Sequence, residues 1–326
     1  MSTPFSSFAG KIRSRYILEV ILLAMCVILA FTAPRFLTVG NFFNVLRNIS
    51  MRGIIAFGMT VVIIAGEIDL SVGSMAALGG CLTAWSVRFL TRGGVGMVPA
   101  ILLGIAASLA IGFLAGALNA VLRNRFSVPT FITTLAFMAS LSGFAMLITG
   151  GFPITPFPEW FNFIGSGYIF GVVPFPAVVF LLVFGILHVT MKYTSFGRSV
   201  YAAGGNAEAA RLSGINVRRV KLIGLGLTSL LASMSGVMVA AQIMSGTPTT
   251  GRGWELDVIS AVIIGGASLS GGSGTVWGTF IGVIFLGVIF NGLTLLGVSE
   301  YWQLVFRGAL ILAAVLLNML QHKTTR

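Results

Sequence analysis

Residues 204–217 read GGNAEAARLSGINV, a polar and alanine-rich stretch that lies between two long apolar runs. Asn206 can cap a helix, because its side-chain oxygen can accept from a free backbone N–H of the first turn. Glu208 then lies where a negative charge meets the positive end of the helix dipole. Gly214 can take the left-handed conformation that ends a helix. We therefore predict a short helix of about eight residues.

This helix is too short to cross a bilayer. Eight residues span about 12 Å, whereas a crossing needs about 20 residues. The basic residues that flank it are Lys192, Arg198, Arg218, Arg219 and Lys221, and a basic loop is typical of the cytoplasmic side. A helix this short is marginal in water, so either its own bundle or a soluble partner should hold it.

The rest of the chain has the composition of a membrane protein. It is 56% hydrophobic and 9% charged, whereas soluble domains carry about 25% charged residues. We predict an all-α polytopic membrane protein, a single domain over residues 1–326 with about ten transmembrane helices. The expected crossings are roughly 16–34, 52–66, 73–91, 96–122, 128–149, 173–191, 220–242, 256–267, 274–296 and 300–320.

The basic residues indicate the orientation. With both termini cytoplasmic, as tails 1–15 and 321–326, most of the 20 Lys and Arg residues lie inside. Residues 192–220 then form a cytoplasmic loop, and 150–172 is a periplasmic loop. Residues 35–52 fit least well, because they place three arginines outside, and they could form a surface helix. The net charge of +12 does not indicate nucleic-acid binding, because the bases are not clustered on one face.

The periplasmic loop is rich in Pro, Gly and aromatic residues and has no Lys or Arg. Proline breaks helices and glycine permits turns, so we expect a folded loop or a short re-entrant piece. Its aromatic side chains could anchor the protein at the membrane interface or dock an external partner.

Two glycine-broken segments echo each other, VIIAGEIDLSVGS at 62–74 and VIIGGASLSGGS at 262–273. Paired interrupted hydrophobic segments in the two halves of a transporter indicate the translocation pathway, although close packing through small residues explains them equally well. Predicted pathway or gating residues are Glu67, Asp69, Ser71, Gly73, Gly266, Ser268 and Ser270.

Acidic residues in the apolar segments indicate function, because a carboxylate at the bilayer centre costs roughly 3 kcal/mol. Asp69 could cap the next helix above Ser71, or Glu67 and Asp69 could relay protons or contact a substrate. Glu255 and Asp257 lie at the external end of a predicted crossing, where they could cap a helix or meet a binding protein. Arg307 could pair with an acid inside the bundle, and Glu300 is a nearby candidate.

Catalytic and metal-binding patterns do not stand out in the sequence. Cys26 and Cys81 lie in apolar segments and are expected to act as small hydrophobes, and His188 is expected to pack rather than to bind a metal. A P-loop requires G-x-x-x-x-G-K-[ST], which the chain lacks. We therefore predict no enzyme, no cofactor and no metal site, and any ATP hydrolysis must come from another chain.

GGNAEAARLSGINV resembles the cytoplasmic coupling loop of permease subunits from ABC sugar importers of the ribose, xylose and galactose type. GEIDLSVGSM (66–75), AVIIGGASLSGGSGTVWGTFIG (261–282) and NGLTLLGVSEYWQ (291–303) match further hallmarks of that family. The resemblance implies a permease of the bacterial inner membrane that imports a monosaccharide, working as a homodimer in membrane lipid. It implies an ATP-binding subunit and a periplasmic sugar-binding protein as partners, the latter docking near Glu255 and Asp257. The implied ATPase-coupling residues are Gly205, Asn206, Glu208, Ala209, Arg211, Ser213 and Gly214.

Two other classes of transporter remain as alternatives. An ion-coupled secondary transporter would use Glu67 or Asp69 as its proton or sodium site, and a channel is a more distant possibility. Neither class requires a polar two-turn helix in the largest basic loop.

Overall fold

The computed structural model describes residues 17–155 and 157–323, so the predicted tail 1–15 and residues 324–326 lie outside the described residues. In chain order the elements are α2 (Ile17–Thr32), α3 (Val39–Ile64), α4 (Val72–Arg92), α5 (Met97–Phe126), α6 (Thr130–Thr149), η1 (Glu159–Phe161), α7 (Asn162–Ser166), β1 (Tyr168–Ile169), β2 (Val173–Pro174), α8 (Phe175–Tyr193), α9 (Ser195–Gly205), α10 (Ala207–Leu212), α11 (Val217–Ile243), α12 (Trp254–Ile264), α13 (Val276–Leu295) and α14 (Glu300–Lys323).

The predicted class, an all-α polytopic membrane protein, is confirmed. Six helices within the described ranges are long and apolar enough to cross a membrane: α3, α5, α6, α8, α11 and α13. A seventh, α2, is apolar but has 16 residues. The only strands among the described residues, β1 and β2, form an antiparallel hairpin with two residues in each strand. β1 lies in the predicted periplasmic loop, and β2 follows directly after it.

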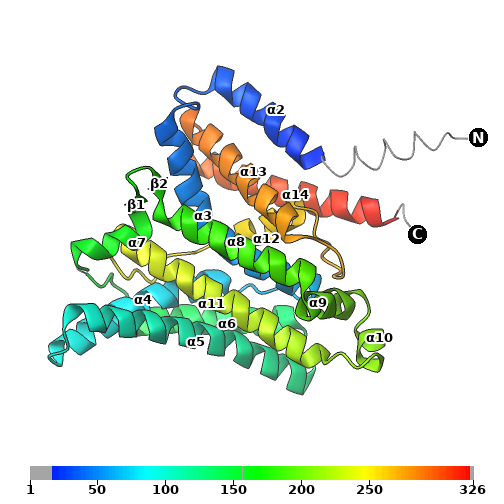
Figure 1. The fold of residues 1–326 in the computed structure, drawn as a ribbon, viewed down its shortest axis with the longest axis horizontal. Coiled ribbons are helices and arrows are strands. Elements are labelled where there is room, and N and C mark those ends of the chain that lie inside the picture. The colour runs from blue at the N-terminus through cyan, green and yellow to red at the C-terminus, as the bar shows by residue number, and fades with distance from the viewer. Residues whose placement is uncertain (1–16, 156, 324–326) are drawn as a thin grey trace, which may run out of the picture.

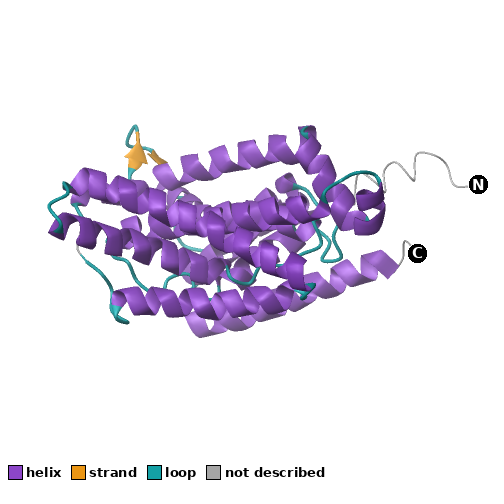
Figure 2. Ribbon diagram, turned by 90° about the horizontal axis from the view of Figure 1, so that it is seen from below, coloured by secondary structure: helices purple, strands orange, loops and turns teal. Residues whose placement is uncertain are grey.

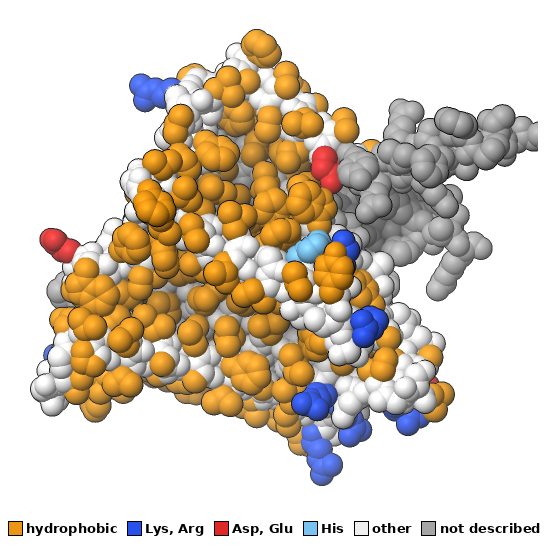
Figure 3. Space-filling model, in the orientation of Figure 1, with side chains coloured by type: hydrophobic (Ala, Val, Ile, Leu, Met, Phe, Trp, Pro, Cys, Tyr) orange, Lys and Arg blue, Asp and Glu red, His pale blue; other side chains and the backbone are white. Residues whose placement is uncertain are grey.

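The long helices run roughly side by side, which gives the molecule two distinct ends (Figures 1 and 2). At one end lie α9, α10, the start of α2 and the end of α14, and we call this the α10 end. The β1–β2 hairpin and α7 lie at the opposite end, which we call the hairpin end. On the face shown in Figure 3, apolar side chains spread over the helices, and basic side chains gather at the α10 end.

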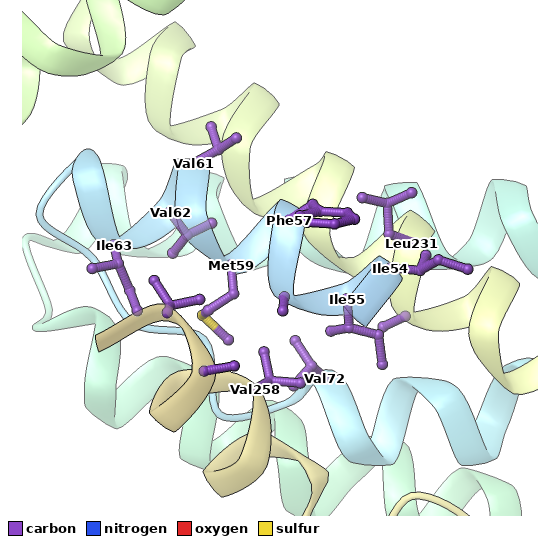
Figure 4. Packing of buried hydrophobic residues seen from close by; sticks show 14 of the residues in the cluster. Ile54, Ile55, Phe57, Met59, Val61, Val62, Ile63, Val72, Leu231 and Val258 are labelled. Carbon is purple, nitrogen blue, oxygen red and sulfur yellow. The ribbon is translucent and has the colours of Figure 1, made fainter. Parts of the chain in front are cut away.

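The core is built on α3 and α11. α11 packs against α3, α4 and α5, and α3 also packs against α8, α12 and α13. Figure 4 shows Ile54, Ile55 and Met59 of α3 beside Leu231 of α11 and Val258 of α12. Both helices are largely buried, so most of their apolar side chains contact protein rather than lipid.

The second crossing is longer than the sequence indicated. We predicted a crossing from residue 52 and left a surface helix over 35–52 open, whereas α3 is continuous over 26 residues. Thr38 caps its start by accepting from the Asn41 backbone N–H at 3.2 Å. Arg52 therefore lies near the middle of α3, about 18 Å from its end at Ile64.

The helix at the predicted crossing 256–267 is too short to cross a bilayer by itself. α12 has 11 residues and spans only about 16 Å. The segment before it folds back into the interior along α4. A Cβ on Gly246 would lie 2.5 Å from the Ala84 Cβ, and a Cβ on Gly73 would lie 2.3 Å from the Gly251 carbonyl oxygen. Because Gly251 meets the first turn of α4, α12 begins deep within the bundle.

The segment 150–172 is a folded loop, as predicted. It contains η1, α7 and the first hairpin strand. Asn162 ties it to the end of α11 by donating to the carbonyl oxygens of Ala241 and Gln242 at 3.1 and 3.2 Å. Ile154 pairs with Gly246 as an isolated antiparallel bridge. The loop therefore covers the point at which the chain turns back into the bundle.

Gly236 tests the close approach of α11 and α4. A Cβ there would lie 1.9 Å from the Ala76 carbonyl oxygen, so the Gly236→Ala substitution forces the two backbones apart. We expect it to lower the free energy of unfolding by about 1–3 kcal/mol, measured by thermal unfolding in detergent. The matched control is Gly143→Ala on α6, where nothing lies within 4 Å and alanine should stabilise the helix by about 0.5–1 kcal/mol. Equal changes in the free energy of unfolding for the two substitutions would contradict the close packing of α11 against α4.

Candidate functional site

The short polar helix forms as the sequence predicts, although it has six residues rather than eight. The Asn206 Oδ1 atom accepts from the backbone N–H groups of Glu208 and Ala209 at 3.1 and 3.0 Å. Gly214 has φ +86°, the left-handed conformation expected after the helix. The predicted cap and stop are therefore both confirmed.

One side of α10 packs on the bundle and the rest is exposed. Ala210 is buried against the neighbouring helix α9 and the start of α11. All seven predicted coupling residues (Gly205, Asn206, Glu208, Ala209, Arg211, Ser213 and Gly214) are exposed. The bundle thus holds α10 on one side and leaves its other sides accessible to a second protein.

Glu208 and Arg211 form an exposed ion pair on α10. The guanidinium group donates to both carboxylate oxygens, at 2.6 and 3.0 Å. These hydrogen bonds hold the pKa of the Glu208 carboxyl below its ordinary value, so this side chain stays ionised near neutral pH. Leu212 beside the pair is 74% exposed, so the accessible surface of α10 combines charge with an apolar side chain.

The two glycine-broken segments contact each other next to the end of α9. The Gly272 N–H donates to the Ile64 carbonyl oxygen at 2.8 Å. A Cβ on Gly204 would lie 1.7 Å from that same oxygen, and a Cβ on Gly271 would lie 2.9 Å from the Gly66 Cα. We call these residues (64–66, 204–205 and 271–272) the glycine junction. It places both breaks directly against the residues that precede α10.

Tyr201 adds a second link between α9 and the later break. Its hydroxyl donates to the Gly274 carbonyl oxygen at 2.9 Å, and burial raises the pKa of this phenol. Within the same break, the Ser268 Oγ accepts from the Ser270 N–H at 3.2 Å, while Gly266 is exposed with φ +88°. The break is therefore an ordered loop that side chains and backbone groups hold in place.

Glu67 is the centre of a buried polar cluster at the α10 end. Its Oε1 atom lies 2.8 Å from Arg123 Nη2 and also contacts the Lys221 ammonium group. Thr130 donates to the other carboxylate oxygen. The side chain of Glu67 is only 6% exposed. This Glu67 cluster joins the α3–α4 loop to the end of α5 and to the starts of α6 and α11.

Asp69 caps α4, as one of the two predictions proposed. Its Oδ1 atom accepts from the Ser71 backbone N–H at 2.8 Å and from the Ser71 hydroxyl at 2.6 Å. The residue is fully buried. Gly73, one turn further, is buried against Gly251. Glu67 thus contacts two cations. Asp69 holds a helix start through its Oδ1 atom, while its Oδ2 atom is buried without a hydrogen-bond partner among the described residues.

A cavity of about 470 Å³ lies between α3, α12, α13 and the end of α11. We call it the outer cavity, because Gln242, Thr294 and Glu300 of its lining lie at or near helix ends toward the hairpin end. Its lining also includes Asp257, Trp254 and two amide side chains of α3, those of Asn44 and Asn48.

Arg307 pairs with an acid inside the bundle, as predicted, but that acid is Asp257 and not the candidate Glu300. The Arg307 Nε atom lies 2.6 Å from Asp257 Oδ1. Arg52 Nε lies 3.4 Å from Asp257 Oδ2. The Asp257 side chain is 6% exposed, and Glu255 is half-buried. The docking role of both residues stays a prediction.

Sequence reasoning missed Arg52 as a partner of this ion cluster. It placed Arg52 in an external segment, although the four-residue spacing of Asn44, Asn48 and Arg52 is a signal that could have identified one polar helix face. The other singled-out side chains behave as packing residues. Cys81 is buried and Cys26 is half-buried, both without a disulfide, and His188 packs against Phe184 with ring centroids 5.4 Å apart.

The Glu67 cluster can be tested by removing its charges one at a time. Glu67→Gln leaves Arg123 and the buried Lys221 without a counter-charge, and breaking such a pair costs about 3–5 kcal/mol. We expect a clearly lower thermal midpoint in detergent, and partial recovery when Lys221→Met is added. The control is Glu208→Gln, which breaks an exposed pair and should change little. A Glu67→Gln variant as stable as this control would contradict the stabilising role of the Glu67 cluster.

Comparison with known proteins agrees with this arrangement. A family model described as "Branched-chain amino acid transport system / permease component" matches residues 41–315. The chain is 43% identical to the ribose import permease protein of Escherichia coli over 301 residues, which cover 91% of each chain. It is 44% identical to that of Bacillus subtilis over 299 residues, covering 91% of this chain and 90% of the relative. No solved structure matches.

A third relative extends the match over nearly the whole chain. The L-arabinose transport system permease protein of Escherichia coli is 36% identical over 327 residues, covering 99% of this chain and 96% of the relative. These relatives are transport permeases of bacteria and not enzymes, so the prediction of a multi-pass permease of the bacterial inner membrane is confirmed. Since the family model spans most of its length, the chain belongs to the permease component family of the branched-chain amino acid transport system type.

Proposed function

We propose that this chain is the membrane permease of an ATP-driven monosaccharide importer, taking up a sugar of the ribose or arabinose class. The observation that carries the proposal is the position of α10. Its seven predicted coupling residues are exposed, and the residues just before it form part of the glycine junction. If a partner binds the exposed sides of α10, the residues just before α10 can transmit its movement to both helix breaks.

The proposed topology has ten crossings, with both termini and the α10 end in the cytoplasm. The basic side chains at the α10 end support this orientation. The ten crossings comprise α2, α3, α4, α5, α6, α8, α11, α12, α13 and α14, of which α12 spans half the membrane by itself. The buried turn before α12 supplies the remaining depth, which is possible only because protein rather than lipid surrounds this backbone.

We propose two kinds of protein partner. An ATP-binding subunit grips α10 from the cytoplasm, and a periplasmic sugar-binding protein delivers substrate at the hairpin end. The permease works as a homodimer surrounded by membrane lipid. The exposed apolar side chains of α2 and α14 provide surface for contact with the second copy and with lipid. Two ATPase subunits would then act on two copies of α10.

The proposed coupling has two routes from α10 to the pathway. The first runs through Gly204 to the carbonyl oxygen of Ile64 at the end of α3. The second runs from the α10–α11 turn to Lys221 and its contact with Glu67. Both routes reach the α3–α4 segment, so closure of the ATPase subunits would move this segment relative to α5 and α6. That movement would open and close the cytoplasmic end.

The contacts of Glu67 and Asp69 weigh against an ion-coupled transporter. A site for a proton or a sodium ion requires an acid that can change its charge or offer free oxygen ligands. Glu67 already contacts two cations and a hydroxyl group. Asp69 holds the start of α4 through Oδ1, and its other oxygen is buried away from any accessible surface. These contacts favour structural and gating roles over ion coupling.

Reconstituted uptake tests the source of energy. We expect proteoliposomes that contain this chain, its ATPase subunit and its binding protein to accumulate labelled D-ribose or L-arabinose when ATP is supplied to the ATPase side. Vesicles that lack the ATPase subunit should not accumulate the sugar, because the chain has no P-loop. Uptake driven by a proton or sodium gradient without that subunit would refute the proposal.

A charge reversal on α10 tests the contact with the ATPase subunit. Glu208→Lys places two like charges beside each other on the exposed surface, so we expect weaker co-purification of the ATPase subunit and slower uptake. The matched control is Glu159→Lys, the same charge change at an exposed position near the hairpin end. It should leave co-purification unchanged. Equal co-purification and full uptake for Glu208→Lys would exclude α10 from the contact.

A further inference from the structure

The outer cavity has a polar wall on α3. Asn44, Asn48 and Arg52 follow one another at intervals of four residues and therefore share one helix face, and all three line the cavity. Asn44 and Asn48 are exposed within a membrane-spanning helix. Polar side chains at membrane depth face the bundle interior or an aqueous cavity rather than lipid. This face therefore belongs to a polar compartment and not to the lipid surface.

The compartment reaches from the hairpin end to the middle of the membrane. Glu300 at the start of α14 lines it, and Arg52 near the middle of α3 lines its deep part. The half-helix α12 begins there, with Trp254 and Asp257 in its first turn. Discontinuous helices that start near the midplane are a common way to build a substrate site in transporters.

The charges at the bottom of the cavity are close together, yet they leave hydrogen-bonding capacity unused. Asp257 lies within ion-pair distance of Arg52 and Arg307. Even so, neither carboxylate oxygen of Asp257 and neither Nε–H of the two arginines has a hydrogen bond of normal geometry within the described part of the chain. Buried polar groups are normally satisfied, so this cluster is held mainly by charge. A small shift of its side chains toward the cavity would let them donate to and accept from a polar ligand.

The charge balance indicates the ligand's charge. Arg52, Asp257 and Glu300 are the charged residues that line the cavity, and Arg307, outside the lining, pairs with Asp257 from behind. An anion would meet two carboxylates in this site, and a cation would meet the Arg52 guanidinium group. A neutral molecule with several hydroxyl groups avoids both repulsions, since each hydroxyl can donate to a carboxylate and accept from a guanidinium or amide group.

Aromatic rings complete the lining. Trp254 and Phe290 line the cavity, and the Arg52 and Arg307 guanidinium groups lie 5.5 and 5.1 Å from the centroids of these rings. These contacts fix the orientation of the two arginines. The volume of about 470 Å³ lies in the range of small-molecule sites, so a single monosaccharide fits together with water.

We propose that the outer cavity is a monosaccharide-binding site within one copy of the permease, with Asp257, Arg52 and the amides of Asn44 and Asn48 as its polar ligands. The inference rests on the proposed function and deepens it by locating where the sugar binds after delivery. The site holds the sugar between the binding protein and the cytoplasmic gate. When the sugar binds, Asp257 and Arg52 replace part of their contacts within the ion cluster by hydrogen bonds to the sugar hydroxyls.

Cysteine labelling tests whether the cavity binds sugar. In a chain with Cys26→Ala and Cys81→Ala, we introduce Asn48→Cys and add a membrane-impermeant maleimide from the side opposite α10. We expect labelling, and we expect saturating D-ribose to slow it at least about threefold. Leu114→Cys, on an exposed apolar face of α5, is the control and should not react. Absence of labelling at residue 48, or equal labelling with and without D-ribose, would overturn the proposal.

Charged sugar analogues test the inferred balance of charges. D-gluconate carries a negative charge and D-glucosamine carries a positive charge, and both are close to a hexose in size. We expect neither to slow labelling of Asn48→Cys as strongly as D-ribose or L-arabinose. Stronger protection by either charged compound would contradict a site built for a neutral ligand.

A steric block separates this inference from the proposed function. Asn48→Trp fills the cavity wall without changing any charge, and we expect it to reduce ATP-driven D-ribose uptake at least about tenfold while ATPase co-purification stays normal. Leu114→Trp is the control and should transport normally. If the unmodified permease fails to import with ATP, the proposed function fails. If it imports and Asn48→Trp imports equally well, the cavity is not on the route and only this inference fails.

Discussion

The structure depends on satisfying backbone groups where helices stop inside the bundle. Each interrupted helix leaves carbonyl and N–H groups that lipid cannot satisfy. The hydrogen bond from Gly272 to the Ile64 carbonyl solves this problem for both breaks at once, because it lets each loop serve as the partner of the other. Only glycine at residue 204 allows α9 to pack against the same carbonyl. The contact between the breaks and the coupling loop thus follows from a requirement of folding.

The interior charges form two clusters at different depths, and each has a different chemical character. Glu67 at the α10 end accepts contacts from two cations and a hydroxyl group, so its carboxylate is fully used. Asp257 lies beside two guanidinium groups but lacks well-formed hydrogen bonds. Breaking a satisfied buried cluster is costly, which suits a latch that holds one conformation. A cluster with unused hydrogen-bonding capacity suits a reversible, weak binding site.

Local signals in the sequence predicted local structure well. Asn206 and Gly214 specified both ends of α10, and Asp69 predicted its own capping bond, because these depend on neighbouring residues alone. Depth in the membrane was predicted poorly. The apolar run after Glu255 looks like an ordinary crossing, and nothing in its periodicity reveals that residues 244–253 first fold back along α4. For the same reason Asp257 was expected outside, and its partners Arg52 and Arg307, which are far away in sequence, could not be identified.

The continuity of α3 links the two clusters mechanically. Its end at Ile64 belongs to the glycine junction, and Arg52 in the outer cavity lies about 18 Å away along the same uninterrupted helix. Packed helices move as rigid bodies rather than by continuous deformation. In the proposed mechanism, a displacement that α10 imposes on Ile64 must therefore shift Arg52 relative to Asp257, which is held on the separate half-helix α12. ATP-driven closure at one end would then alter the sugar site at the other, without any flexible connection between them.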